Sequence, residues 1–349
     1  MIIYMNFKKY KGKGLTGLAN LGNTCFVNSI LQCLSHSYEV NDFLEGGDYK
    51  SKMNKKAESL ILMEWDKLRI MMWSENCTIS PGGFVSAVHR VAKIKGKAIF
   101  TGFAQNDLPE FLIFLIDCFH TGIQREVEMV IKGRIITDKD KVAKKCFEMM
   151  QNMYKNEYSE FLHFFYGTHL SKISTLSGKT LSLKPEPFNI LSLPIPNKSN
   201  VSLYDCLDLY TETEVLEGEN QYYNENKKAK EDAKRSIEFW EFPTLLIIDL
   251  KRFTNNNKKI QVLVDFPLEN LDLSKYIVGY QKEQFKYDLY GICNHSGSVF
   301  GGHYTACIKN ANNTWYNFND TTITAVKNIE KLKSPKAYCF FYRKKKSQP

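Results

Sequence analysis

Apolar positions recur with two different periods, and the change of period falls near residue 165. Before that point, apolar side chains return at spacings of three and four, which is typical of helices with one buried face. The spacing predicts helices over Ala57–Met72, Gly82–Val91, Asp107–His120 and Val142–Phe165. The first half of the chain is therefore expected to be helical.

After residue 165, apolar and polar residues alternate over short segments separated by Pro, Gly and Asn, which indicates strands. The strands are expected over Leu181–Leu183, Phe188–Leu193, Leu245–Leu250, Tyr287–Cys293, His303–Lys309, Thr314–Asn319 and Tyr338–Tyr342. The charged stretch Glu212–Arg235 has few aliphatic residues, so we expect a loop or a projecting element there. The order of elements predicts an α+β fold, with helices first and sheet second.

Cys25 is expected in the first turn of another helix, because the loop residues Asn20–Thr24 precede it and apolar residues at helical spacing follow it. Unpaired N–H groups and the positive end of the helix dipole stabilise a thiolate in a first turn. The alternative is that Cys25 is an ordinary small buried residue. The position of Cys25 makes it a candidate nucleophile.

Composition narrows the class of protein. The 349 residues are 43% hydrophobic and 13% aromatic, which is enough for a large core. No apolar run is long enough for a membrane span, and no secretory signal is recognisable at the N-terminus. Nine cysteines, none spaced Cys-x-x-Cys, argue against a disulfide framework or a structural zinc site. We therefore expect a soluble protein of a reducing compartment, cytoplasmic or nuclear, without a membrane partner.

The formal charge of +9 comes from short clusters such as Arg343–Lys346. These clusters are not interleaved with aromatic residues on one element, as a nucleic-acid surface requires. They are expected to be solvated faces, and no nucleic-acid partner is expected.

His303 stands apart from the other histidines, which lie in or next to unremarkable helical patterns or lack a distinctive setting. It opens a strand directly after Gly301 and Gly302, and paired glycines leave room for another backbone to approach. A thiol nucleophile needs such an imidazole as its base, and the imidazole needs a third group to orient it.

The hairpin that begins at His303 offers two such groups. If Lys309 pairs with Thr314, His303 lies opposite Asp320, within reach of its carboxylate. A one-residue bulge would present Asn319 instead, as a neutral acceptor. Both alternatives place base and orienting group on one hairpin.

Five blocks of sequence, in order, resemble the ubiquitin-specific protease family of cysteine deubiquitinases. Gly17–Leu34 resembles its cysteine box, and Gly291–Ala306 with Trp315–Asp320 resembles its histidine box. The other matching blocks are Phe103–Leu112, Phe188–Pro194 and Leu246–Phe253. The resemblance extends from about Gly14 to Arg343, nearly the whole chain.

The resemblance implies roles for individual residues. Cys25 would be the nucleophile, His303 the general base, and Asp320 the group that orients it, with Asn319 assisting. Asn20 corresponds to the amide that faces the developing oxyanion, a contribution of about 2.7–4 kcal/mol in comparable enzymes.

A second set of residues would bind the substrate. Asp107 and Glu110 lie on one helical face after Gln105, and in the family these positions hold the basic residues of the ubiquitin tail. Asp107 and Glu110 could equally cap the helix and interact with its dipole. Tyr304, with Gly301 and Gly302, is expected to line the channel for the terminal glycines.

The implied fold is a papain-like core with a thumb near 15–165, fingers near 166–240 and a palm near 241–345. Residues 1–14 would form an extension and residues 346–349 a tail. Many family members bind zinc in the fingers, but here the corresponding positions hold Thr175, Gly178, Asn224 and Lys227. We therefore expect no zinc and no other cofactor, with fingers held by packing and hydrogen bonds.

The expected activity is hydrolysis, through an acyl-enzyme, of the isopeptide or peptide bond after the C-terminal glycine of ubiquitin. The partners would be ubiquitin and ubiquitinated proteins, and the enzyme is expected to be a monomer whose cleft closes around substrate. The alternatives are an inactive ubiquitin-binding module, a protease for a ubiquitin-like modifier, and another Cys-His-Asp enzyme such as a transglutaminase or a generic thiol peptidase.

Overall fold

A computed structural model describes residues 7–345 except 103–105, 255, 257 and 299–300. The α-helices are α1 (Cys25–Ser35), α2 (Tyr38–Glu45), α3 (Tyr49–Lys52), α4 (Ser59–Ser74), α5 (Gly82–Ile94), α6 (Leu108–Gly122), α7 (Asp138–Glu157), α8 (Phe161–Phe165) and α9 (Leu203–Thr211). Short 3-10 helices are η1 (Phe7–Tyr10), η2 (Ala98–Phe100), η3 (Gly218–Asn220), η4 (Ser274–Tyr276), η5 (Lys282–Gln284) and η6 (Ile329–Leu332).

The strands of the first two thirds of the chain are β1 (Gly17–Leu18), β2 (Thr78–Ile79), β3 (Gly167–Thr175), β4 (Thr180–Phe188), β5 (Ile190–Leu193), β6 (Val201–Ser202), β7 (Glu214–Leu216), β8 (Tyr222–Asn224), β9 (Ala229–Glu231) and β10 (Ala233–Glu241). They are followed by β11 (Leu245–Leu250), β12 (Val264–Asp265), β13 (Leu271–Asp272), β14 (Lys286–Ser298), β15 (Gly301–Lys309), β16 (Trp315–Asn319), β17 (Thr322–Ala325) and β18 (Ala337–Lys344).

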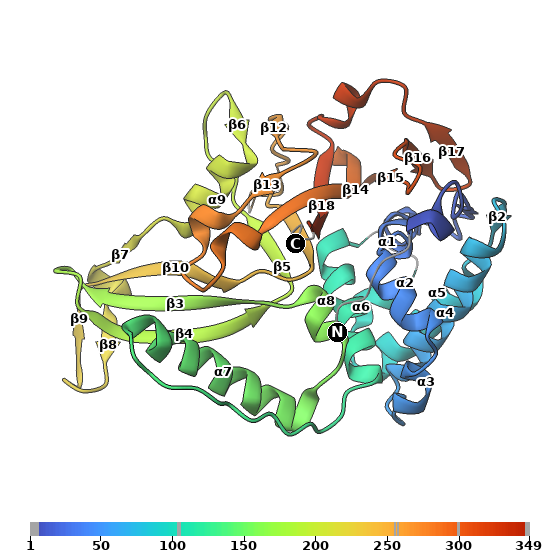
Figure 1. Ribbon diagram of the computed structural model, residues 1–349. Helices are drawn as coiled ribbons and strands as arrows, with labels where there is room; N and C mark the ends of the chain where they lie inside the picture. The colour runs from blue at the N-terminus through green and yellow to red at the C-terminus, as the bar shows by residue number, and fades with distance from the viewer. Residues whose placement is uncertain (1–6, 103–105, 255, 257, 299–300, 346–349) are drawn as a thin grey trace.

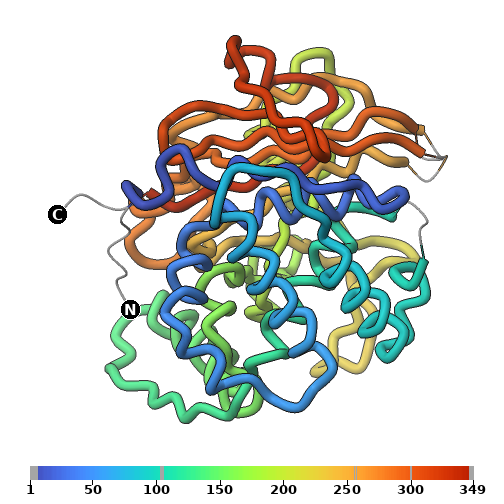
Figure 2. Tube along the Cα trace, turned by 90° about the vertical axis from the view of Figure 1, so that its right-hand side faces the viewer, coloured from blue at the N-terminus to red at the C-terminus, as the bar shows by residue number. Residues whose placement is uncertain are grey.

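The molecule has three main parts: an eight-stranded sheet, a group of helices and a four-stranded sheet. An eight-stranded sheet runs in the order β17-β16-β15-β14-β18-β11-β5, with β13 paired to β14. Helices α1 to α6 and α8 gather on one side of it (Figure 1). A four-stranded sheet, β4-β3-β10-β7, projects away from the helices with α7 along it. Seen from the helical side, the N-terminal segment in dark blue crosses between helices and sheet (Figure 2).

The eight-stranded sheet has a hydrophobic core on each face. Alternate residues of β11 show this division: Leu245 and Ile247 belong to the core shared with the helices, whereas Leu246 and Ile248 belong to the core on the other face. All eleven residues of α1 are buried, and this helix packs against β14, β15, β16 and α6. Cys25 is therefore carried by the most enclosed helix of the fold.

The expected helix over 142–165 is wrong as a single element. The chain leaves α7 at Tyr158, which is extended and exchanges two backbone hydrogen bonds with Arg125, each 2.9 Å long. A pairing between distant residues thus overrides local helical periodicity, and α8 begins anew at Phe161.

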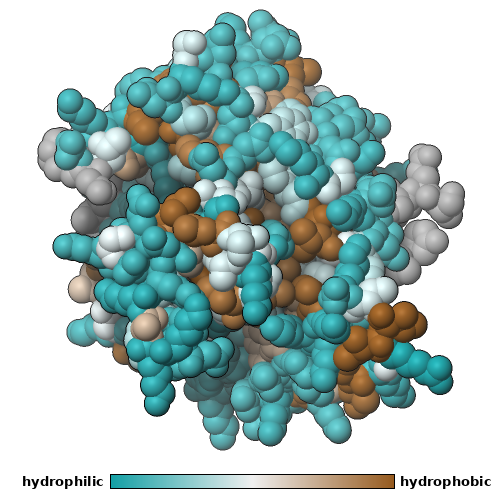
Figure 3. All heavy atoms as spheres, turned by 90° about the vertical axis from the view of Figure 1, so that its left-hand side faces the viewer, coloured by the Kyte–Doolittle hydropathy of each residue, from teal (hydrophilic) through white to brown (hydrophobic). Residues whose placement is uncertain are grey.

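Helix α9 is a further difference from the expectations, although Ser202 and Asp205 form a reciprocal capping box at its start. Within residues 212–235, where a loop or a projecting element was expected, the chain forms short strands, and the β8–β9 hairpin projects at the far end of the four-stranded sheet (Figure 1). That outer end faces the viewer in Figure 3, where apolar side chains are exposed within a mainly hydrophilic surface.

The expected hairpin register is also wrong. Lys309 pairs with Trp315 rather than with Thr314, and the regular ladder ends at the Ala306–Phe318 pair. The register is displaced because Asn310 and Asn313 close the turn with hydrogen bonds of their own, from Asn310 N to Thr314 O and from Asn313 N to Asn310 O. Within the described residues, none of the helices is long and apolar enough to cross a bilayer.

Candidate active site

Cys25 is the first residue of α1 and only 2% exposed. The loop before it is held by Asn20, whose Oδ1 accepts hydrogen bonds from Gly22 N at 3.0 Å and Thr24 N at 3.2 Å. Thr24, at the N-cap, makes no side-chain hydrogen bond to the helix start. The N–H groups around Cys25 therefore have no capping side chain, and those of Cys25 and Phe26 interact with the thiol.

Asp320 joins this loop to the sheet. Its Oδ1 accepts a 2.8 Å hydrogen bond from Asn28 Nδ2, its Oδ2 accepts one of 3.0 Å from Asn20 Nδ2, and its carbonyl accepts one of 2.9 Å from Leu18 N. Asp320 adopts the left-handed conformation, with φ at 49°. One residue thus connects α1, the cysteine loop and the turn after β16.

Gly17 permits this close approach. A Cβ added at Gly17 would lie 2.5 Å from the carbonyl oxygen of Thr321, a distance that backbone atoms cannot tolerate. Only glycine allows the first strand to reach the turn that carries Asp320.

His303 is oriented by Asn319. Its Nε2 lies 2.6 Å from Asn319 Oδ1. Because an amide oxygen only accepts, Nε2 carries the proton, and Nδ1 is left as the basic nitrogen. The expected position of Asp320 opposite His303 is wrong, since the observed register and the left-handed turn direct its carboxylate to Asn20 and Asn28. The contact that forms, between His303 and Asn319, is the one expected for a one-residue bulge.

Cys25 and His303 do not share a hydrogen bond within the part of the chain that the structure describes. The thiol instead interacts with the backbone of Tyr304, the residue after His303. The two groups therefore come from facing elements, α1 and β15.

The expected stabilisation of a Cys25 thiolate by the N–H groups of the helix start is present, but burial outweighs it. Burial raises the pKa of the Cys25 thiol, and the charge of Asp320 raises it further, while backbone hydrogen bonds from Tyr304 and Phe26 only partly offset these effects. The raised pKa favours the protonated thiol, so a nucleophilic role of Cys25 would require a base that removes its proton.

Gly302 has no side chain, which leaves space for the ring of His295. A Cβ there would lie 2.3 Å from Nε2 of His295. The His295 ring is buried, packs 4.6 Å from the ring of Tyr304, and has its pKa lowered by burial to about 4. The neutral His295 ring therefore packs against one side of Gly302, where the sequence had indicated room for another backbone.

Asp107 and Glu110 lie at the start of α6, as the helical spacing predicted. Asp107 precedes the helix and accepts a 2.7 Å hydrogen bond from the hydroxyl of Tyr338, and Glu110 is exposed. Desolvation of the carboxyl group raises the pKa of Asp107, and the hydrogen bond from Tyr338 partly opposes this increase. Gln105 lies outside the described residues.

The sequence did not identify four residues that contact or lie near the candidate site residues: Asn28, His295, Tyr338 and Asp249. Asp249 is buried behind Asp107, accepts a 2.6 Å hydrogen bond from Ser192, and has its pKa raised by burial to about 6. It belongs to the Leu246–Phe253 block, so a carboxylate within an apolar strand was the available signal.

At the positions that the family resemblance aligns with zinc ligands, polar side chains make local hydrogen bonds. Thr175 lies 2.9 Å from Ser177, and Asn224 accepts bonds from the N–H groups of Asn226 and Lys227. Among the described residues, no group of three or more His, Cys, Asp or Glu side chains is arranged to hold a metal ion.

Comparisons with known proteins agree on one family. The sequence model described as "Ubiquitin carboxyl-terminal hydrolase" matches residues 16–342. Ubiquitin carboxyl-terminal hydrolase 2 of Bos taurus is 32% identical over 348 residues, covering 97% of this chain and 56% of the relative. The Gallus gallus protein of the same name is 34% identical, covering 95% of this chain and 93% of the relative.

A solved structure matches the fold. The SAGA DUB module of Ubp8, Sgf11, Sus1 and Sgf73 bound to ubiquitin aldehyde aligns with a TM-score of 0.72 at 24% identity, over 99% of this chain and 72% of the other. The chain spans little more than half the length of the mammalian relatives named "Ubiquitin carboxyl-terminal hydrolase 2".

Proposed function

Because the chain belongs to the ubiquitin carboxyl-terminal hydrolase family, we propose that it is a thiol-dependent deubiquitinase. It hydrolyses the isopeptide or peptide bond after the C-terminal glycine of ubiquitin, and ubiquitin and ubiquitinated proteins are its partners. The observation that carries the proposal is the meeting of the Cys25 loop with the His303–Asn319 pair across Asp320.

The geometry supports a division of roles. When substrate aligns the two walls, Nδ1 of His303 takes the proton of Cys25, and the sulfur attacks the glycine carbonyl. The backbone N–H of Cys25 and the second amide hydrogen of Asn20 donate to the oxyanion, since the first amide hydrogen is used by Asp320. Protonated His303 then gives its proton to the leaving amine.

Hydrolysis of the resulting thioester completes the cycle. Nδ1 of His303 takes a proton from water, the hydroxide adds to the acyl carbon, and the Cys25 thiolate leaves and is reprotonated. Asn319 holds Nε2 throughout, while Asp320 is a positioning residue for the cysteine loop in the resting enzyme.

Substrate recognition would depend on two acidic residues at the start of α6, here called the acidic entrance. Asp107, positioned by Tyr338, and the exposed Glu110 would pair with basic residues of the ubiquitin tail. Gln105 from the same block is assigned to this entrance by sequence alone. Gly301, Gly302 and Tyr304 form the strand along which the terminal glycines would pass.

The remaining assignments follow from the same site. Residues 15–345 would act as one catalytic domain, with thumb, fingers and palm bounded near 165 and 240. One chain supplies every proposed catalytic residue, so a monomer is sufficient for catalysis. All nine cysteines are free, which supports a reducing intracellular compartment.

The test compares Cys25→Ala with Cys77→Ala, a change at a partly exposed cysteine outside the site. Release of a fluorophore from the C-terminus of ubiquitin should be abolished only by Cys25→Ala. Wild-type turnover by that variant would refute the proposal. A purified chain that binds ubiquitin but does not react with a ubiquitin C-terminal electrophile would be a binding module, and preferential reaction with a ubiquitin-like probe would identify a different modifier.

A further inference from the structure

Residues 126–135, here called the strap, run alongside α7 without forming a strand in the described structure. Their side chains nevertheless alternate as in a strand: Glu126, Glu128, Val130 and Lys132 are exposed, whereas Val127, Met129 and Ile131 are partly buried. The strap is therefore an extended segment with one solvent-facing row of side chains.

Only one edge of the strap backbone is used by the protein. Val127 N donates a 2.9 Å hydrogen bond to Tyr154 O, and Met129 O accepts one of 2.6 Å from Gln151 Nε2. In an extended chain, the N–H and C=O of successive residues point to opposite sides. The odd-numbered residues thus point toward α7, and the backbone groups of Glu128, Val130 and Lys132 point away from it.

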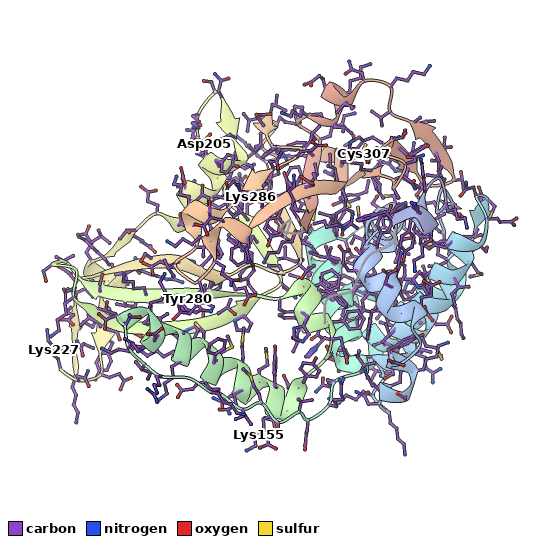
Figure 4. The ribbon with its side chains drawn as sticks, viewed as in Figure 1. Lys155, Asp205, Lys227, Tyr280, Lys286 and Cys307 are labelled. Atoms are coloured by element: carbon purple, nitrogen blue, oxygen red, sulfur yellow. The ribbon has the colours of Figure 1, made fainter. Side chains whose placement is uncertain are left out.

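The outward edge is unpaired. Within the described residues, the backbone groups of Glu128, Val130 and Lys132 have no hydrogen-bond partner in the chain. On its inner side the strap borders a groove of about 1200 Å³, lined along α7 from near Tyr280 to Lys155 (Figure 4). Unpaired strand edges of this kind are templates for pairing with another strand.

The exposed row is complementary to itself when reversed. Read forwards it is Glu126, Glu128, Val130, Lys132 and Arg134. An antiparallel copy centred on Val130 places Lys132 opposite Glu128 and Arg134 opposite Glu126, each pair occurring twice. A parallel copy in register would instead oppose like charges, which is destabilising.

We propose that the strap pairs with the strap of a second copy of this chain, antiparallel about Val130, to form a two-fold symmetric dimer. The centre is an apolar contact, since Val130 is 63% exposed in the single chain, and Glu128–Lys132 pairs flank it on both sides. At Gly133 the backbone leaves the extended range of L-residues, with φ at 142°, so the regular ladder is short and the dimer depends on concentration.

The dimer would leave the catalytic groups free. The strap and α7 lie along the four-stranded sheet, away from α1 and β15, which carry Cys25 and His303 (Figure 1). The inference is therefore independent of the proposed enzymatic activity.

Sedimentation velocity over a range of protein concentrations tests the proposal. The wild-type chain should pass from monomer to dimer, and Glu128→Lys or Lys132→Glu alone should weaken the dimer about ten-fold or more. The double exchange Glu128→Lys/Lys132→Glu should restore it. An equimolar mixture of the two single variants should form a heterodimer, because every opposed pair is then complementary.

The control is Glu157→Lys, which changes the net charge by the same amount as Glu128→Lys but at an exposed position of α7. It should dimerise as the wild type does. A wild-type chain that stays monomeric at all concentrations, or single variants that dimerise normally, would overturn the proposal. Capture of an unrelated extended peptide by a monomeric chain would overturn it too.

Discussion

The side-chain amide of Asn28 donates a 2.8 Å hydrogen bond to the carboxylate of Asp320, a residue 292 positions later in the chain. Asn28 lies one helical turn after Cys25, and Asp320 follows directly after Asn319. The bond therefore ties the helix that carries the proposed nucleophile to the hairpin that carries the proposed base. We expect the position of Cys25 relative to His303 to depend on it.

Asn28→Asp should disrupt this connection with almost no change of shape. Two carboxylates would then face each other, and the hydrogen bonds from Asn28 to the carbonyls of Leu18 and Ala19 would be lost as well. We expect a loss of about 1–3 kcal/mol in the free energy of unfolding and at least a ten-fold fall in kcat/KM near neutral pH. Urea unfolding and turnover of a ubiquitin fluorogenic amide measure both.

The same substitution at the exposed Asn156 of α7 is the control and should change neither quantity. The stability defect of Asn28→Asp should shrink at acidic pH, where one carboxylate is protonated. A variant as stable and active as the wild type at neutral pH would show that the Asn28–Asp320 bond has no positioning role.

Asn319→Ala and Asp320→Ala should have different effects. Asn319 accepts from Nε2 of His303, so its removal frees the ring, and we expect kcat to fall by about 10²-fold with little change in stability. Asp320 accepts hydrogen bonds from Asn20 and Asn28, so Asp320→Ala should lower the free energy of unfolding. Its effect on kcat should be smaller than that of Asn319→Ala.

Parallel measurement of kcat and of the thermal unfolding midpoint separates the two roles. If Asp320→Ala lowered kcat far more than Asn319→Ala and left stability unchanged, Asp320 would be the group that orients His303 during turnover.

Asp107→Asn should weaken binding of the ubiquitin tail more than catalysis. The amide keeps an acceptor for the Tyr338 hydroxyl but loses the charge that pairs with a basic side chain. We expect KM for the ubiquitin substrate to rise about ten-fold, with kcat within a factor of two, and added salt should narrow the gap to the wild type. Asp117→Asn, further along the same helix, is the control, and a KM equal to that of the wild type in Asp107→Asn would contradict the assignment.

Asp249 predicts a particular pH dependence of stability. Burial raises its pKa from 3.8 to about 6, so the folded protein binds this proton more tightly than the unfolded chain. The resulting stabilisation is fully present below pH about 4 and is lost as pH rises through about 6. Asp249→Asn keeps an acceptor for Ser192 and should therefore increase the free energy of unfolding above pH 6, by up to about 2 kcal/mol.

Urea unfolding of both proteins between pH 4 and pH 8 checks this difference, which should approach zero at the acidic end. Asp48→Asn, at an exposed position, should give a difference that does not change across this range. An Asp249→Asn variant that is less stable than the wild type at pH 7.5 would mean that the carboxylate is ionised and paired in the fold.

Part of the candidate site could be predicted from the sequence. The sequence located Cys25 at a helix start, His303 after two glycines and the acidic pair of α6, because loop residues, apolar spacing and strand alternation act over a few neighbouring positions. The residues that these groups contact could not be predicted in the same way. Asn28 is an ordinary helical residue by sequence, and only its contact with Asp320 distinguishes it.

The sequence by itself determined the class of fold, the general order of helices first and sheet second, and the main candidate groups of the site, since local periodicity and turn residues reflect short-range conformational preferences. The tertiary structure alone decided which group each of them contacts. The turn at Asn310–Asn313 moved the hairpin register by one residue, the Arg125–Tyr158 pairing divided a helix, and burial raised the pKa of Cys25 against the influence of the helix start. Each of these outcomes depends on residues far apart in the chain, whose free energies of packing and desolvation outweigh local preference.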